Sequence, residues 1–401
     1  MRPQKELPEI KPQPLNTVGL YLCPALMDWV VCFVSFAVFY AAGARGAGLR
    51  ECGWLGMLYQ AAYMASSLVS GHVITRRNAR AVLWVSTLGC GVSSAAALGS
   101  SAFAYLAAGL IVFGAAVAWF FNSFQAVMRG EGALGSLKSS VSLYTLSWCM
   151  GSALGTLTSG WFFQGGVTAL VAAVLIATAA MAILLARNAR PSTDGPLPEE
   201  TVEHGTRQKY PVSNAYIAVG WLMIFTVTFV QRPIFTFLPP LFAAEGIGSL
   251  QASLPLFLHL AVSAVFGLFL YRYRDTLYRR TPFVIFQSAG AAALCAMWRW
   301  PTYWVCFSML CLLGIYAGYA YYCAVYYASN SGRRSFNIGV NEALVGFGSV
   351  AGILLGDLWM RRSGSSAGLY LVCAAGLALS LIVQLGLARR PCPPQASRPP
   401  S

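Results

Sequence analysis

The sequence predicts an all-α membrane protein in which twelve transmembrane helices form two six-helix bundles. The first observation is composition: 57% of the 401 residues are hydrophobic and 10% are charged, with a mean hydropathy of +0.61, which is too apolar for a soluble domain. The second is that windows of roughly 20 apolar residues, enough for a helix to cross a hydrocarbon core of about 30 Å, recur along the chain. The third is a single long hydrophilic segment in mid-sequence, which predicts the division into two bundles.

The spans are expected to be helices because segments such as 167–186, VTALVAAVLIATAAMAILLA, show none of the alternation of a barrel strand. In the first half, the expected spans are residues 18–42, 51–74, 81–99, 103–127, 139–163 and 166–187. In the second half, they are residues 214–242, 249–271, 281–298, 302–327, 335–360 and 366–388. The first 17 residues are polar and proline-rich, and we expect them to remain as a tail.

The eleven cysteines have neither CxxC nor Cys/His metal spacing. They are therefore expected to be free thiols inside helices rather than disulfides or zinc ligands. The sequence predicts no metal and no cofactor.

Lysine and arginine predict the orientation of the chain. If the N-terminus is cytoplasmic, 21 of the 27 basic residues fall on the cytoplasmic side and five on the other, and Arg232 lies within a span. The positive-inside rule then places both termini in the cytoplasm. The formal charge of +14 is spread over short loops rather than gathered on one face, so nucleic acid is not an expected partner. We expect a monomer in the plasma (inner) membrane.

The hydrophilic segment, residues 188–213, is rich in Pro, Gly and charge, as a linker is. It divides a first bundle, residues 1–187, from a second, residues 214–401. The span 139–163 carries CMGSALGTLTSG and the span 335–360 carries GFGSVAGILLGD, so Gly151 and Gly155 recur 197 positions later as Gly348 and Gly352. Such parallel halves, related by an axis along the membrane normal, place a substrate site at their interface. Small residues at every fourth position predict close surfaces that slide between the halves, or static packing.

The chain resembles the major facilitator superfamily over essentially its whole length. In that family, the loop between the second and third helices carries a Gly, an acid, an Arg, a second Gly and a further basic residue. GHVITRRNAR matches this pattern at Gly71, Arg76 and Arg80, whereas Thr75 stands where the acid belongs and Asn78 where the second Gly belongs.

The counterpart of this loop in the second half keeps Gly267 and Arg272, and Thr156 follows Gly155 where antiporters of the family have a proline. The resemblance implies a secondary transporter that works by alternating access. It also implies a central cavity lined by the first, fourth, seventh and tenth helices.

Ionisable residues within the spans are the main functional candidates, because a charge at a helix centre costs roughly 2.5 to 3.5 kcal/mol or more. Asp28 lies about ten residues into the first span, near the midplane. A carboxylate there is a candidate proton carrier, and a structural acid is the alternative.

Arg232 stays protonated, so it needs a carboxylate, a substrate anion or water. We expect it to attract the polar or anionic end of a substrate and to pair with Asp28 when the site is empty. In the alternative interpretation, its side chain extends to the outer interface.

Three further ionisable residues lie within the spans. His259 is a second candidate for proton coupling, although a lone histidine among leucines is more often a packing residue. Glu342 lies near the cytoplasmic end of its span and is expected to form a closing ion pair with the basic loops or to be structural. Asp357 stands four residues before Arg361 and is expected to form an interfacial helical pair.

Aromatic and amide side chains predict a cavity for a small organic solute. Trp119, Asn122 and Gln125 share one helical face, and Tyr316, Tyr319 and Tyr326 share another. Ordinary packing between helices is the alternative for both sets.

We expect no enzyme. The stretch GEGALGSLKSS lacks the Gly-Lys adjacency of a phosphate loop, and the two intramembrane aspartates, Asp28 and Asp357, lie at different depths, which excludes a shared proton as in an aspartyl protease. The sequence thus predicts a secondary active transporter of a small organic solute, coupled to protons. The alternative function is a nontransporting membrane sensor or scaffold of transporter descent.

Overall fold

The computed structural model describes residues 14–75, 78–130, 137–188, 214–272, 277–329 and 334–388. These residues form twelve α-helices and one 3-10 helix, η1 (Phe163–Gly165), and confirm the all-helical prediction. The first six are α1 (Pro14–Ala44), α2 (Leu49–Val73), α3 (Ala79–Gly99), α4 (Phe103–Gly130), α5 (Leu137–Phe162) and α6 (Gly166–Asn188). The second six are α7 (Asn214–Ala244), α8 (Ser249–Arg272), α9 (Arg280–Arg299), α10 (Tyr303–Ser329), α11 (Arg334–Ser363) and α12 (Gly368–Leu387).

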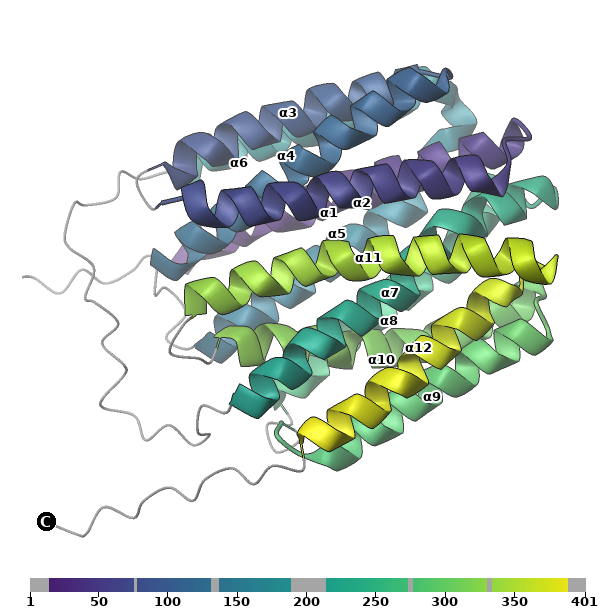
Figure 1. Ribbon diagram of the computed structural model, residues 1–401. Helices are drawn as coiled ribbons and strands as arrows, with labels where there is room; N and C mark the ends of the chain where they lie inside the picture. The colour runs from purple at the N-terminus through teal and green to yellow at the C-terminus, as the bar shows by residue number, and fades with distance from the viewer. Residues whose placement is uncertain are drawn as a thin grey trace, which may run out of the picture.

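Ten helical stretches of the described chain are long and apolar enough to cross a membrane, and one of them, Leu143–Arg187, contains parts of both α5 and α6. The helix outside this set is α2, which carries Arg50, Glu51 and Gln60 among its apolar residues. The helices run roughly along one common direction (Figure 1). We call the end where α1 begins and α12 stops the terminal end, and the other the opposite end.

The two halves repeat one another down to single hydrogen bonds. α1 and α7 both end in a turn with a glycine at positive φ, Gly46 (74°) and Gly246 (75°). In the first turn the Ala47 N–H donates to the Ala42 carbonyl at 2.9 Å, and in the second the Ile247 N–H donates to the Phe242 carbonyl at 2.9 Å. Glycine suits this helix stop because it adopts the left-handed conformation without steric cost.

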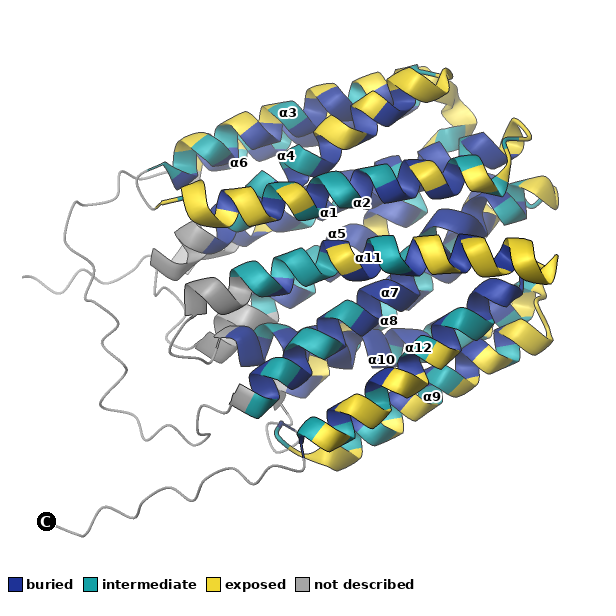
Figure 2. Cartoon of the chain, in the orientation of Figure 1, coloured by how far each residue is buried: buried dark blue, intermediate teal, exposed yellow. Residues whose placement is uncertain are grey.

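Inner and outer helices differ in what they expose. Figure 1 shows α3 and α6 along one edge of the molecule and α9 and α12 along the other. These outer helices expose large apolar side chains, among them Val92, Ile176, Ile285 and Ile382, and the yellow bands along them in Figure 2 follow these faces. Exposed apolar stripes of this kind suit contact with lipid.

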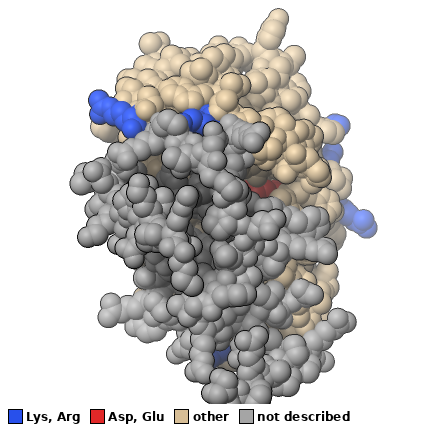
Figure 3. Space-filling model, turned by 90° about the vertical axis from the view of Figure 1, so that its left-hand side faces the viewer, with Lys and Arg blue, Asp and Glu red and all other residues tan. Residues whose placement is uncertain are grey.

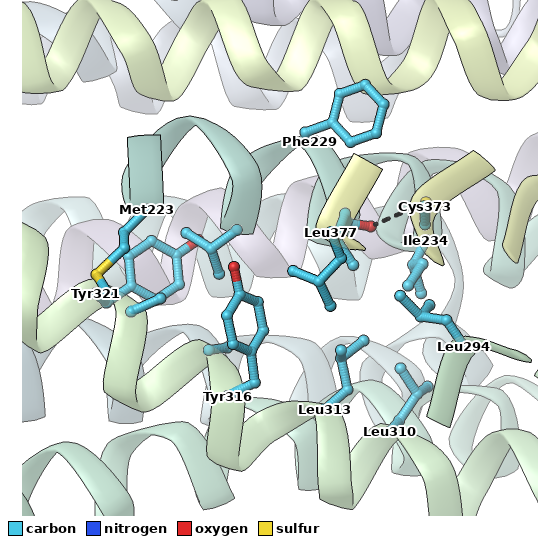
Figure 4. Packing of buried hydrophobic residues seen from close by; sticks show 14 of the residues in the cluster. Met223, Phe229, Ile234, Leu294, Leu310, Leu313, Tyr316, Tyr321, Cys373 and Leu377 are labelled. Atoms are coloured by element: carbon cyan, nitrogen blue, oxygen red, sulfur yellow. Dashed lines mark hydrogen bonds between the residues drawn. The ribbon is translucent and has the colours of Figure 1, made fainter. Parts of the chain in front are cut away.

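Each half has its own hydrophobic core. One cluster of buried side chains is drawn mainly from α1 to α6, and the other mainly from α7 to α12. Figure 4 shows part of the second, where Leu294, Leu310, Leu313 and Leu377 lie on one side of Tyr316 and Met223 and Tyr321 on the other.

The repeated glycines Gly151, Gly155, Gly348 and Gly352 contact helices of their own half. Other glycines of the same two helices contact the opposite half, as we expected: Gly160 of α5 meets Ser253 of α8, and Gly346 of α11 meets Met64 of α2. A Cβ added to Gly151 would lie 2.0 Å from the Ala25 carbonyl oxygen of α1, and one added to Gly352 would lie 2.1 Å from the Phe229 carbonyl oxygen of α7. Gly155 and Gly348 make the corresponding contacts with Trp29 and Phe225. The stripe therefore brings α5 onto α1 and α11 onto α7, because only glycine leaves room for a backbone carbonyl at these distances.

Candidate functional site

A cavity of about 90 Å³ lies between the two halves, and its acidic and basic lining residues are Asp28 from α1, Arg232 from α7 and Glu342 from α11. Its wall comes from eight helices, with no lining residue from α3, α6, α9 or α12. A polar cavity of this size has room for water. The chain thus gathers both signs of charge around one small cavity between its halves.

Asp28 and Arg232 share this cavity without forming an ion pair, contrary to the pairing that we expected. Within the described part of the chain, the ion pair present is that of Asp357 with Arg361 at 2.5 Å, which confirms the helical pair predicted for those residues. Ser152 of α5 lines the cavity together with Asp28. The Nε of Arg232 is buried and has no hydrogen-bond partner among the described residues. An unsatisfied buried donor on a cation is costly.

Glu342 joins the two halves through neutral donors. Tyr63 of α2 donates its hydroxyl hydrogen to Oε2 at 2.6 Å, and Gln125 of α4 donates from Nε2 to Oε1 at 2.9 Å. The basic loops that we expected to pair with Glu342 lie largely outside the described residues, so that ion pair stays a prediction. Each carboxylate oxygen already accepts one bond, and hydrogen bonds to an ionised acceptor are among the stronger ones. We call Tyr63, Gln125 and Glu342 the latch.

The opposite end is also bridged between the halves. The Tyr40 hydroxyl donates to the Ile247 carbonyl at 2.8 Å, and the Ser249 hydroxyl donates to the Gly160 carbonyl at 2.7 Å. In this conformation, therefore, hydrogen bonds cross between the halves at the opposite end and at the latch.

Breaking the latch is expected to favour a state open at the terminal end. A hydrogen bond to a charged group contributes roughly 1.5 to 3 kcal/mol, so Tyr63→Phe and Glu342→Gln should each shift the equilibrium about tenfold or more. The measurement is the distance between spin labels at Gly71 of α2 and Gly339 of α11, where an added Cβ meets no neighbour within 4 Å. The background lacks the exposed Cys295 and Cys392.

Tyr59→Phe is the matched control for this experiment. Tyr59 lies one turn away on the same helix, lines the same cavity and makes no hydroxyl hydrogen bond among the described residues. Unchanged distances in both latch variants, or an equal change in Tyr59→Phe, would contradict the latch.

His259 is engaged on both ring nitrogens and does not line the cavity. Its Nδ1 lies 3.1 Å from the Leu310 carbonyl, which only accepts, so Nδ1 carries the hydrogen. Its Nε2 therefore accepts from Nε2 of Gln231 at 3.2 Å, and Gln231 in turn accepts from the Tyr321 hydroxyl. These bonds agree with the packing alternative for His259. Of the three hydrogen-bonded side chains His259, Gln231 and Tyr321, the last two line the cavity.

Most of the α4 and α10 residues that we expected to line the cavity do not line it. Gln125 reaches it through Glu342, whereas Asn122 bonds to Ser70 Oγ of α2 at 2.5 Å and Trp119 is half-buried away from the lining.

On α10, the residues that line the cavity are Tyr321 and Val325. Tyr316 packs in the second core, Tyr319 contacts Phe286 with ring centroids 5.1 Å apart, and Tyr326 stacks on Tyr322. The physical reason is rotation: residues 321 and 325 are one turn apart, and residues 319 and 326 share another face.

Several lining residues are not singled out by the sequence, among them Gln60, Tyr63, Trp148, Gln231, Tyr321 and Asn341. The signal that was available is an amide inside an apolar span, which marks Gln60, Gln231 and Asn341. The tyrosines carry no such signal, because tyrosine is common in packed helices.

The loop motif is partly described. Gly71 lies near the terminal end of α2 with open space around it, Arg80 lies in the first turn of α3, and Arg76 lies outside the described residues. Thr75 and Asn78, the two residues that depart from the family pattern, are hydrogen-bonded to each other: the Thr75 N–H donates to Oδ1 of Asn78 at 2.7 Å. Asn78 also donates from Nδ2 to the Val73 carbonyl at 2.9 Å, so it closes the turn between α2 and α3.

Figure 3 views the molecule from the terminal end. The described surface in this view is mostly tan, with a few blue basic groups and one small red acidic patch. Charge is therefore sparse on the described surface that faces this end.

Comparison with known proteins gives the same fold. Residues 18–332 match the family model described as Major Facilitator Superfamily. Among solved structures, a mutant of the nucleoside transporter NupG superposes with a TM-score of 0.63 at 12% identity, covering 93% of this chain and 99% of that one. The human organic anion transporter MFSD10 (TETRAN) superposes with a TM-score of 0.67 at 13% identity, covering 93% and 100%. No curated protein sequence matches the chain.

Proposed function

Because the chain belongs to the Major Facilitator Superfamily, and is thus an integral multi-pass membrane transporter rather than an enzyme, we propose that it moves a small organic solute by proton-coupled alternating access. The observation that carries this proposal is the cavity, where one carboxylate from the first half and one guanidinium and one carboxylate from the second half meet. Charges placed at membrane depth are costly, and transporters use them along substrate and proton pathways.

In the proposed cycle, Arg232 binds an anionic group of the solute. Its buried Nε, which has no partner among the described residues, favours a ligand with an oxygen acceptor. Asp28 carries the proton. When its carboxyl group is protonated and neutral, it does not compete with the solute anion for Arg232. When it is deprotonated and charged, it competes for Arg232 and favours release of the solute. Gln60, Gln231 and Asn341 offer amide groups that orient a polar solute.

We further propose that the halves are residues 1–187 and 214–401, joined by a linker at residues 188–213 that lies almost wholly outside the described residues. The separate hydrophobic cores support this division. The excess of basic residues at the terminal end supports cytoplasmic termini. We also propose that the protein lies in the plasma (inner) membrane and is a monomer.

The test is uptake into proteoliposomes with an imposed pH gradient, using a panel of radiolabelled small carboxylates, sugars and aromatic solutes as probes. We expect at least one anionic probe to accumulate above its equilibrium level. In Asp28→Asn the same probe should still equilibrate, but the response to the gradient should fall at least tenfold.

Ser152→Ala is the control for this test, because it removes a neighbour of Asp28 and keeps the carboxylate. An equal gradient response in the unaltered chain and in Asp28→Asn would remove Asp28 as the carrier. No movement of any probe would favour a nontransporting sensor.

A further inference from the structure

A long groove opens on the outer side of the second half, between α7, α11 and α12, which lie side by side in Figure 1. Its volume is about 1030 Å³, more than ten times that of the central cavity. Phe225 and Phe229 line it from α7, Leu355 from α11, and Leu379 and Val383 from α12. Leu379 is 63% exposed, so the groove faces outward from the bundle rather than into the seam between the halves.

The hydroxyl groups within the groove are hydrogen-bonded to each other. Thr226 and Ser380 are its hydroxyl residues, and Thr226 donates to Ser380 Oγ at 2.6 Å. Gly376 of α12 lies one turn from Ser380, on the side of the opposite end. A Cβ added to Gly376 would lie 2.5 Å from the Phe229 ring. The glycine thus lets α12 approach α7 closely and leaves the rest of the groove apolar. Its chemistry fits a hydrocarbon chain rather than a polar solute.

The length of the groove matches one leaflet of a bilayer. On α12 it runs from Leu371 to Val383, twelve residues apart, which is about 18 Å at 1.5 Å per residue. Half of a hydrocarbon core of about 30 Å is about 15 Å. A chain lying in the groove would therefore extend from the headgroup region at the opposite end to about the midplane.

The headgroup end of the groove carries a cation and an indole. Arg362 and Trp359 both line it at the end of α11. The adjacent Arg361 is neutralised by Asp357 at 2.5 Å, whereas Arg362 has no partner among the described residues. Tryptophan suits the interface between headgroups and hydrocarbon, and a free guanidinium at that level complements a phosphate.

We propose that this groove is a binding site for an anionic phospholipid of the leaflet at the opposite end. One acyl chain lies along Phe225, Phe229 and Leu379, and the phosphate contacts Arg362 beside Trp359. The site belongs to the second half alone and does not depend on what the central cavity transports.

The test is native mass spectrometry of the full chain in mild detergent, titrated with phosphatidylglycerol or phosphatidylcholine. Arg362→Gln is expected to lower the occupancy by phosphatidylglycerol about fivefold, from the attraction of one basic residue to an anionic surface, with less effect on phosphatidylcholine. Arg299→Gln is the matched control, since it is an exposed arginine beside a tryptophan at the same end that does not line the groove.

A second pair of variants tests whether the lipid acyl chain lies in the groove. Ala375→Trp fills the groove and should lower the occupancy by both lipids, whereas Ala378→Trp places the same side chain on an exposed face of α12 outside the lining and should not. The proposal is overturned if Arg299→Gln lowers phosphatidylglycerol occupancy as much as Arg362→Gln does. It is also overturned if both tryptophan variants retain lipid equally.

Discussion

Replacing Arg232 by alanine is expected to abolish transport of the anionic probe while leaving the protein folded. The guanidinium lines the cavity, and its Nε has no protein partner among the described residues, so no protein acceptor there loses a bond when it is removed. A solute anion bound in the cavity would lose its counter-charge, and truncating one partner of a buried charge pair costs roughly 2 to 5 kcal/mol. Initial uptake at low probe concentration should therefore fall at least about thirtyfold.

Lysine at the same position separates charge from geometry. Arg232→Lys keeps one positive charge but loses the planar fork that binds a carboxylate through two parallel bonds. We expect partial uptake, several-fold below that of the unaltered chain, with a weaker apparent affinity. The measurement is initial uptake against probe concentration in proteoliposomes, with Arg299→Ala as an arginine control outside the cavity. Unchanged affinity in both Arg232 variants would contradict substrate binding by this residue.

Replacing Gly352 by valine is expected to damage the fold severely. A Cβ there would lie 2.1 Å from the Phe229 carbonyl oxygen, and that carbonyl lacks its usual helical donor because Pro233 has no N–H. α11 would have to move away from α7 along much of their contact. Overpacking a tight interface costs about 1 to 3 kcal/mol and more where backbone must shift.

The measurement for this prediction is the fraction of monodisperse protein after extraction, together with its melting temperature in detergent. Gly155→Val is expected to behave similarly, since its Cβ would meet the Trp29 carbonyl oxygen at 2.3 Å. Gly71→Ala is the control, because a Cβ at that position has no neighbour within 4 Å. If Gly352→Val melted at the same temperature as Gly71→Ala, the close contact of α11 with α7 would be wrong.

The helices could be predicted from the sequence because the bilayer fixes their length. Each predicted span lies within a few residues of a helix, as residues 249–271 do with Ser249–Arg272, since polar loops must follow about every 20 to 30 apolar residues. Asp28, Arg232 and Glu342 could be singled out for the same reason: a charge inside an apolar span needs a polar environment. Their meeting at one cavity follows from the packing of the halves.

The partners of these charges could not be predicted, because they depend on packing between distant segments. Tyr63 and Glu342 are 279 positions apart, and Gln125 and Glu342 are 217 apart. A sequence pattern sets the period of a helix but not its rotation about its axis. This is why Tyr321 of α10 lines the cavity where Tyr319 was expected. The glycine stripes show the same limit, since they indicate close approach without indicating the partner helix.

The cavity contains a natural reporter for the central claim, which is that the halves open one shared chamber to each side of the membrane in turn. Cys32 lines the cavity beside Asp28 and is buried. A small membrane-impermeant methanethiosulfonate reagent, applied separately to each face of oriented proteoliposomes, should modify Cys32 from both faces, with Cys32→Ser as the control and with protection by a transported probe. Modification from neither face, or from one face only under every gradient and probe, would contradict alternating access through this cavity.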